Sequence, residues 1–183
     1  MKDIYIGLGA NLGNRAANLG MALRYLSPLA VVEEVSSLYE TTPVGPPSAS
    51  SWERQPNFYN AVCRISSGLA PLALLRYLKS IEFEIGRRPD GSWAPRPIDL
   101  DFLLYGEDVV AVDGLALPHP RLAERAFVLA PLCDLAPAMR HPVLGKTVRE
   151  MLDAVGEAGV EVVAASGWEA GTSSLVAKRE ATG

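Results

Sequence analysis

Two carboxylates interrupt an otherwise apolar stretch. Asp99 and Asp101 stand two residues apart within residues 96–105. At the two-residue repeat of a strand both point to one face with Leu103, while the other face receives Ile98, Leu100, Phe102 and Leu104. Spaced about 6.6 Å apart along a strand, both can bind one or two hard cations that carry phosphates. Because like charges repel and Asp is disfavoured in strands, the pattern favours a magnesium site. A solvated strand face without function is the alternative.

An arginine-rich loop precedes the carboxylates. Residues 87–96 contain Arg87, Arg88 and Arg96 together with Trp93. Arginine binds phosphate oxygens through several donors at once, so the loop is a candidate lid over a polyphosphate. An exposed basic loop is the alternative, but it does not explain the tryptophan.

A further basic cluster follows the carboxylates. His119 stands between two prolines and is followed by Arg121 and Arg125. A single histidine is usually structural, but the prolines hold this one rigidly beside additional arginine.

Residues 58–66 contain a candidate platform for a flat heterocycle. The alternation of this stretch places Phe58 and Asn60 opposite the apolar side chains of Tyr59, Ala61, Cys63 and Ile65. A phenylalanine stacks on a ring and an amide recognises its edge, although two surface positions without function are the alternative. The long preceding loop, residues 41–56 with Trp52, is either functional or, in its middle, disordered.

Periodicity predicts an α+β domain around these residues. Alternation predicts strands over 3–9, 31–40, 58–66 and 98–105, with short strands at 109–110 and 115–117. Helical spacing predicts one helix between Asn14 and Pro28 and a second between Pro71 and Gly86. Two more helices are expected over residues 127–135 and 147–155.

Composition limits the possible classes. The chain has 183 residues, 49% of them hydrophobic, and a net charge of −4, which argues against nucleic-acid binding by bulk electrostatics. No apolar run is long enough for a bilayer, and the two cysteines with no signal peptide fit a reduced cytoplasmic protein. We expect one domain over residues 1–156 and a poorly ordered tail over 157–183, with 160–164 as a possible edge strand.

Six blocks of this sequence, taken together, resemble a known family. They are YIGLGANLG (5–13), TPVG (42–45), FYNA (58–61), GRR (86–88), WAPRPIDLD (93–101) and PHPR (118–121). In order and approximate spacing they resemble 6-hydroxymethyl-7,8-dihydropterin pyrophosphokinase of the folate pathway, over residues 3 to about 155.

The resemblance implies a fold and a reaction. The fold would be a ferredoxin-like antiparallel sheet with helices on one face and extra C-terminal helices. The enzyme would transfer the pyrophosphoryl group of ATP to the pterin hydroxymethyl oxygen and release AMP, with two Mg²⁺ ions. We expect a monomer with no nucleic-acid or membrane partner.

The resemblance also assigns roles to individual residues. Asp99 and Asp101 would hold the metal ions, and with Arg87 and Arg96 they would form the catalytic set. The ATP site would comprise Glu82, Arg87, Trp93, Arg96, His119 and Arg125. The pterin site would comprise Thr41, Thr42, Pro43, Val44, Phe58, Asn60, Trp93, Asp99 and Phe127, with the two phenylalanines stacking on the ring.

Three positions depart from the family pattern. Ser92 replaces a basic residue, Pro89 removes another charge, and Gly114 lacks a side chain near the adenine. Neither the loop over residues 46–57 nor the tail receives a role. The competing hypothesis is a non-catalytic ferredoxin-like module that binds RNA or a small molecule. An RNA-binding sheet carries stacked aromatics with basic neighbours, whereas here the Asp pair would repel the backbone.

Overall fold

The structure, a computed structural model, describes residues 2–44, 55–88 and 94–171. The larger sheet contains β1 (Ile4–Ala10), β2 (Val31–Val35), β3 (Leu38–Thr41), β4 (Phe58–Ser66), β5 (Asp99–Tyr105) and β8 (Val160–Ala164). A small hairpin contains β6 (Val110–Val112) and β7 (Leu115–Leu117). The helices are α1 (Arg15–Leu26), α2 (Pro71–Ile85), α3 (Ala126–Leu135), α4 (Val148–Val155) and the short 3₁₀ helix η2 (Leu122–Glu124).

The larger sheet is antiparallel and ferredoxin-like. Its strand order is β5-β1-β4-β3-β8, and β2 also pairs with β4. Counting β2 and β3 as one interrupted strand, the chain follows the order strand–helix–strand–strand–helix–strand from β1 to β5. This arrangement makes β1 an inner strand, paired with β4 on one side and with β5 on the other. The predicted α+β class is confirmed.

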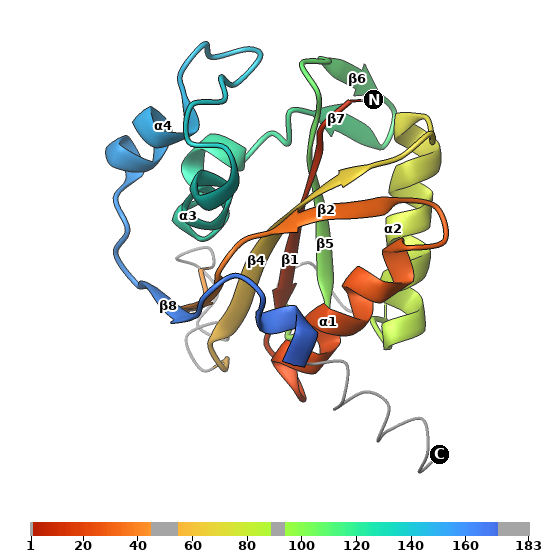
Figure 1. Cartoon of the computed structure of the whole chain (residues 1–183). Coiled ribbons are helices and arrows are strands. Elements are labelled where there is room, and N and C mark those ends of the chain that lie inside the picture. Colours follow the sequence, from red (N-terminus) through yellow and green to blue (C-terminus); the bar gives the residue numbers. More distant parts are fainter. Residues whose placement is uncertain (1, 45–54, 89–93, 172–183) are drawn as a thin grey trace.

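Helices cover both faces of the sheet, as Figure 1 shows. The apolar stripes of α1 and α2 pack on one face in a core that includes Leu19, Leu26, Leu74 and Leu78. On the opposite face α3 and α4 contribute to a second core with buried side chains such as Leu129. Two layers of helix around one sheet satisfy the need to bury both of its apolar faces.

Capping residues set the helix boundaries, and the sequence predicts those at Asn14, Pro71 and Gly86. The Asn14 side chain accepts a hydrogen bond from the Ala17 backbone at 3.1 Å at the start of α1. Pro71 is the first residue of α2, and Gly86 ends it with a φ of 111°. Thr147 and Glu150 form a capping box at the start of α4. These local signals explain why the predicted helices are accurate to about a residue.

The predicted strand over residues 31–40 is wrong, because it is two strands. Val35 pairs with Cys63 and Tyr39 with Asn60. The segment from Val35 to Tyr39 therefore contains one residue more than the segment of β4 that it faces. The Ser36 hydroxyl accepts a hydrogen bond from the Val62 backbone at 2.9 Å and takes the place of a ladder bond. A side chain that substitutes for the backbone interrupts the strand here.

A bulge also changes one predicted side-chain direction in β5. Tyr5 pairs with Leu104 and Ile6 with Phe102, so Leu103 is the extra residue. Leu103 and Leu104 therefore both pack in the core beneath α3 and α4, whereas the sequence predicted Leu104 on the opposite face. The bulge lies beyond the carboxylates and leaves their shared face unchanged.

The expectation of a poorly ordered tail is wrong for residues 157–171. Strand β8 pairs antiparallel with β3 at the edge of the sheet, and the Trp168 indole donates to the Ser36 carbonyl at 3.0 Å. The possible edge strand over 160–164 is thereby confirmed. Residues 172–183 lie outside the described residues. Within the described part of the chain, the helices are all too short or too polar to cross a membrane.

The core beneath α1 and α2 should dominate the stability of the sheet. Leu78 is fully buried, whereas Leu72 of the same helix is 38% exposed. Leu78→Ala should lower the free energy of unfolding by about 2–5 kcal/mol, since a cavity remains. Leu72→Ala should change it by only about 0.5 kcal/mol. Urea unfolding of both variants tests this, and equal losses would contradict the assignment of the core.

Candidate active site

A cavity of about 280 Å³ lies on the face of the sheet that α3 partly covers. Its floor follows from the strand register, since cross-strand partners share a face. Gly9 pairs with Asp99 on one side and Asn60 on the other. Gly7 likewise pairs with Asp101 and Val62. The two glycines of β1 thus leave a hollow between the carboxylates and the amide.

Gly9 is required for this hollow. A Cβ atom at Gly9 would lie only 3.0 Å from the Asn60 Oδ1 atom and 3.8 Å from the Asp99 Cβ atom. Any side chain at this position would therefore displace the amide or fill the floor. The sequence showed these glycines only as part of a turn-like pattern, and their role as a floor was not predicted.

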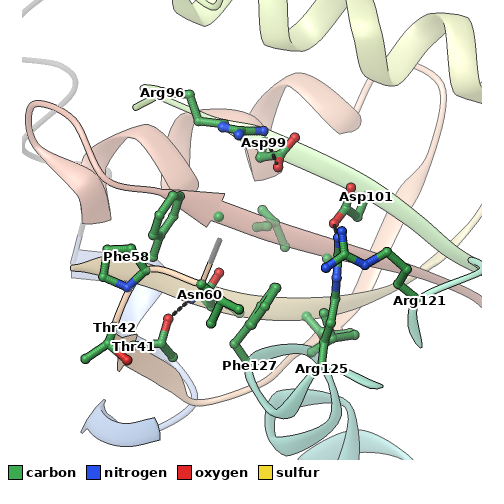
Figure 2. Close-up of a pocket in the computed structure, with 18 of the residues that line it drawn as sticks. Thr41, Thr42, Phe58, Asn60, Arg96, Asp99, Asp101, Arg121, Arg125 and Phe127 are labelled. Atoms are coloured by element: carbon green, nitrogen blue, oxygen red, sulfur yellow. Dashed lines mark hydrogen bonds and ion pairs between the residues drawn. The ribbon is translucent and has the colours of Figure 1, made fainter. Parts of the chain in front are cut away.

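Arginines contact both carboxylates. Asp99 accepts hydrogen bonds from Arg87 and, at 3.0 Å, from Arg96. Asp101 accepts one from Arg125 at 3.3 Å. Figure 2 shows Arg96 and Asp99 at one side of the cavity and Asp101 beside Arg125 and Arg121. The predicted common face of the two carboxylates is confirmed.

The two carboxylates differ in their electrostatic surroundings. Burial favours the neutral form of Asp99, but the charges of Arg96 and Arg87 outweigh it and hold the pKa of this carboxyl below its usual value. Burial raises the pKa of Asp101, and repulsion from Asp99 adds to it against the attraction of His119 and Arg125. Asp101 therefore has a deficit of positive charge that a cation could fill.

Glu82 fixes one of the arginines. This buried side chain accepts hydrogen bonds through Oε1 from Lys79 at 2.9 Å, Arg87 at 2.6 Å and the Leu100 backbone at 2.7 Å. Burial raises the pKa of Glu82 despite these cationic neighbours. The carboxylate thereby ties α2 to β5 and holds Arg87 against Asp99. It lies behind the cavity rather than on its lining.

The other end of the cavity is formed by aromatic rings and an amide. Phe58 from β4 and Phe127 from α3 stand on either side of it, with Asn60 between them (Figure 2). The Asn60 Nδ2 atom donates to Thr41 Oγ1 at 2.6 Å, which leaves Oδ1 toward the floor. Residues 41–44 complete this wall. A flat ring could enter between the two phenylalanines and meet polar atoms at its edge.

His119 is held next to the cavity without lining it. Its backbone donates to the Leu103 carbonyl at 2.8 Å, and its Nδ1 accepts from the Arg121 backbone at 3.1 Å. Burial lowers the pKa of His119 against the attraction of Asp101. Because Nδ1 accepts a hydrogen bond, the ring carries a proton on Nε2, which is available as a donor.

Asn11 organises both loops around the cavity, although the sequence did not single it out. Its Oδ1 accepts from the Arg96 backbone at 2.7 Å, and its Nδ2 donates to Gln55 Oε1 at 3.0 Å. Gln55 and Arg96 both line the cavity, as does Arg121, which was also missed as a site residue. An asparagine within a glycine-rich turn resembles any turn residue, so the sequence offered no signal for this role.

Most predicted site residues are brought together. The cavity is lined by Thr41, Thr42, Pro43, Val44, Phe58, Asn60, Arg96, Asp99, Asp101, Arg125 and Phe127. Glu82, Arg87 and His119 lie one contact away. Trp93, Pro89, Ser92 and the middle of the loop over 46–57 lie outside the described residues.

The chain is similar to known proteins of one family. A family model for 7,8-dihydro-6-hydroxymethylpterin-pyrophosphokinase matches residues 5–137. The 2-amino-4-hydroxy-6-hydroxymethyldihydropteridine pyrophosphokinase of Aquifex aeolicus is 36% identical over 82% of this chain and 90% of its own length. The protein of the same name from Pseudomonas aeruginosa is 41% identical over 88% of this chain and 96% of its own length.

Some relatives are much longer. The chain spans only 21% of the folic acid synthesis protein fol1 of Pneumocystis carinii, at 38% identity. The crystal structure of wild-type Plasmodium falciparum HPPK-DHPS superposes with a TM-score of 0.64 at 17% identity, over 83% of this chain and 44% of that one, which supports the fold.

The matches decide between the two hypotheses drawn from the sequence. The relatives that the chain covers almost end to end carry the name of a pyrophosphokinase, and a non-catalytic RNA- or ligand-binding module is not favoured. The family model and these identities show that the chain belongs to the 7,8-dihydro-6-hydroxymethylpterin-pyrophosphokinase family, whose enzymes act in folate biosynthesis.

Proposed function

We propose that this chain transfers the pyrophosphoryl group of ATP to the hydroxymethyl oxygen of 6-hydroxymethyl-7,8-dihydropterin and releases AMP. One observation carries the proposal. A single cavity has two carboxylates among arginines at one end and an amide between two phenylalanines at the other. Such a cavity has room and chemistry for a polyphosphate and for a flat heterocycle side by side.

The charged end is assigned to the ATP phosphates and Mg²⁺. Asp99 and Asp101 offer oxygen ligands on one face, which suits a hard cation. Within the described residues, no group of three or more His, Cys, Asp or Glu could hold an ion by itself. Phosphate oxygens would therefore complete the coordination of the two ions that we propose. When bound, Mg²⁺ neutralises phosphate charge and aligns the transferred group.

The arginines of this end are proposed to bind the phosphates. Arg96 and Arg125 line the cavity, and Arg87 reaches it through Asp99. In the absence of ligand their charges are balanced by the carboxylates, so each is already positioned beside the place of the reaction. Glu82 and His119 are proposed to support the nucleotide site from beside the cavity, Glu82 through its contact with Arg87. The contact of Trp93 with ATP stays a prediction.

The aromatic end is assigned to the pterin. Phe58 and Phe127 would stack on its two faces while Asn60 and the backbone of residues 41–44 satisfy its polar edge. The hydroxymethyl group would then point along the floor toward the carboxylates. Gly7 and Gly9 leave this path open because neither has a side chain.

The chemistry requires positioning more than a reactive side chain. The hydroxymethyl oxygen attacks the β-phosphorus, and the bond from that phosphorus to the oxygen shared with the α-phosphate breaks. AMP leaves with that oxygen, and the hydroxymethyl proton passes to solvent or to a phosphate. Within this scheme the chain aligns the two substrates and stabilises negative charge through Arg87, Arg96 and Arg125.

The direct test is to mix the protein with ATP, Mg²⁺ and the reduced pterin and to follow AMP by chromatography. AMP should form only when the pterin is present, in step with loss of the pterin. Formation of ADP, or of AMP at the same rate without pterin, would contradict the proposal.

Asp101→Asn tests the metal assignment. The rate of AMP formation should fall by at least about 100-fold, because an essential ligand of the charged end is lost. Asp113→Asn, at an exposed turn position, is the matched control and should keep the wild-type rate. A fully active Asp101→Asn enzyme would overturn the assignment.

Asp101→Asn should not lower the thermal stability of the protein in the absence of metal, although it should lower the activity. Because the pKa of Asp101 is raised in the folded state, its ionised form costs stability. This cost is absent below the ordinary pKa of the group and complete above the raised pKa. At neutral pH without Mg²⁺, Asp101→Asn should therefore unfold at the same temperature as wild type or slightly above it. Thermal unfolding followed by circular dichroism measures this, and a clear loss of stability would contradict it.

A pair of variants separates the two ends of the cavity. Asn60→Ala should weaken pterin binding by about 1–3 kcal/mol, the cost of an unmade buried hydrogen bond, and leave nucleotide binding nearly unchanged. Arg96→Ala should weaken binding of a non-hydrolysable Mg-ATP analogue more than binding of the pterin. Titration calorimetry with each ligand checks both variants, and the reverse pattern would refute the assignment of the ends.

A further inference from the structure

The wall of the aromatic end is supported from outside the sheet by the C-terminal segment. Strand β3 is only four residues long and ends at Thr41, which contributes to this wall. On its outer side β8 pairs with it along its whole length, from Leu38 opposite Ala164 to Thr41 opposite Val160. The inner partner β4 carries Asn60, which donates to Thr41 Oγ1. Thr41 is therefore held from both sides.

The contact continues beyond the strand into the cavity wall. The Thr42 backbone donates to the Gly159 carbonyl at 3.4 Å. Gly159 has a φ of +73°, and a Cβ atom at this position would lie 2.9 Å from Thr42 Oγ1. Thr42 also lines the cavity. The absence of a side chain at Gly159 thus sets how closely the C-terminal segment approaches the wall.

The far end of the segment is anchored in the core. The Trp168 indole donates to the Ser36 carbonyl at 3.0 Å, and its ring packs against the core beneath α1 and α2. Residues 159–168, which we call the C-terminal strap, therefore run along β3 from its end at the cavity back to its beginning. Figure 1 shows β8 along this edge of the sheet, followed by a short helical segment.

We propose that the C-terminal strap positions the pterin wall, and that Gly159 is the positioning residue through its contact with Thr42. The proposal rests on the proposed function, because it concerns the pterin end of the same cavity. The strap makes no contact with Asp99 or Asp101, which lie across β1 and β4 from β3. Its effect is therefore specific to the pterin and spares the nucleotide.

Gly159→Ala tests the proposal against a matched control in the same segment. The new methyl group must push the Thr42 side chain and so deform the wall. Gly156 has a similar φ of +78°, but a Cβ atom there would meet nothing within 4 Å. Both substitutions place a side chain at a positive φ, where L-residues are strained, and Gly156, with a ψ of 169°, lies in a region that is almost restricted to glycine. Only the Cβ atom of Gly159→Ala meets the cavity wall, so a loss of pterin affinity confined to this variant does not come from backbone strain alone.

The measurement is titration calorimetry of each variant with the reduced pterin in the presence of a non-hydrolysable Mg-ATP analogue, and of the analogue alone. Gly159→Ala should weaken pterin binding about fivefold or more, the equivalent of one hydrogen bond. Gly156→Ala should stay within about twofold of wild type, a small fraction of one hydrogen bond. Binding of the analogue should be the same in all three proteins. Equal pterin affinity in both variants, or an equal loss in both, would overturn the proposal.

Thr42→Ala and the double variant Thr42→Ala/Gly159→Ala isolate the steric contact. They also show whether a loss of affinity in Gly159→Ala comes from this contact or from poor folding of the variant. In a Thr42→Ala background the clashing Oγ1 atom is absent. Gly159→Ala should then change pterin affinity by less than about twofold relative to Thr42→Ala alone, a small fraction of one hydrogen bond. A loss as large as in the wild-type background would overturn the mechanism. If wild type itself fails to bind the pterin, the proposed function fails, which is distinct from failure of the strap.

Discussion

Balance of charge around two neighbouring carboxylates is the constraint on which the rest of the site depends. Asp99 and Asp101 share one face of β5, mostly out of water, where like charges repel strongly. Arg87 and Arg96 form ion pairs with the first, whereas among the described residues the second forms one ion pair, with Arg125, and burial and repulsion from Asp99 raise its pKa. Ion pairs with the carboxylates therefore hold these arginines beside β5. Glu82 on α2 adds a second ion pair to Arg87 and so keeps it against Asp99.

The second constraint is space for the substrates above the sheet, and the glycines of β1 provide it. A cavity on a sheet needs a place where side chains are missing, and Gly7 and Gly9 supply it between strands that carry the functional groups. Asp99 and the amide of Asn60 lie in one cross-strand row through Gly9, and Asp101 lies in the next row on the same face, through Gly7, so the distance between the two ends is set by the sheet itself. A rigid sheet suits a reaction that depends on alignment of two substrates.

Local signals in the sequence were sufficient for most of the fold, because caps and alternation act over a few residues. Asn14, Pro71 and Gly86 marked helix ends correctly, and the alternation around Asp99 placed both carboxylates on one face. The errors arose where a tertiary contact changed the local rule. Ser36 split one predicted strand by hydrogen bonding across the sheet, and the bulge at Leu103 reversed the direction of the residue after it. Asn11 was missed for the same reason, since its role consists of contacts with residues far away in the chain, and β8 was predicted only as a possible edge strand.

The most direct test of the account follows the phosphorus atoms. ATP carrying ¹⁸O at the non-bridging oxygens of the β- and γ-phosphates is incubated with the protein, Mg²⁺ and 6-hydroxymethyl-7,8-dihydropterin, and the mass of the isolated pterin product is measured by mass spectrometry. If the cavity aligns the hydroxymethyl oxygen with the β-phosphorus, both labels appear together in a pterin diphosphate, and unlabelled AMP accumulates in equal amount. A pterin monophosphate carrying only the γ label, with ADP as the other product, would contradict the account.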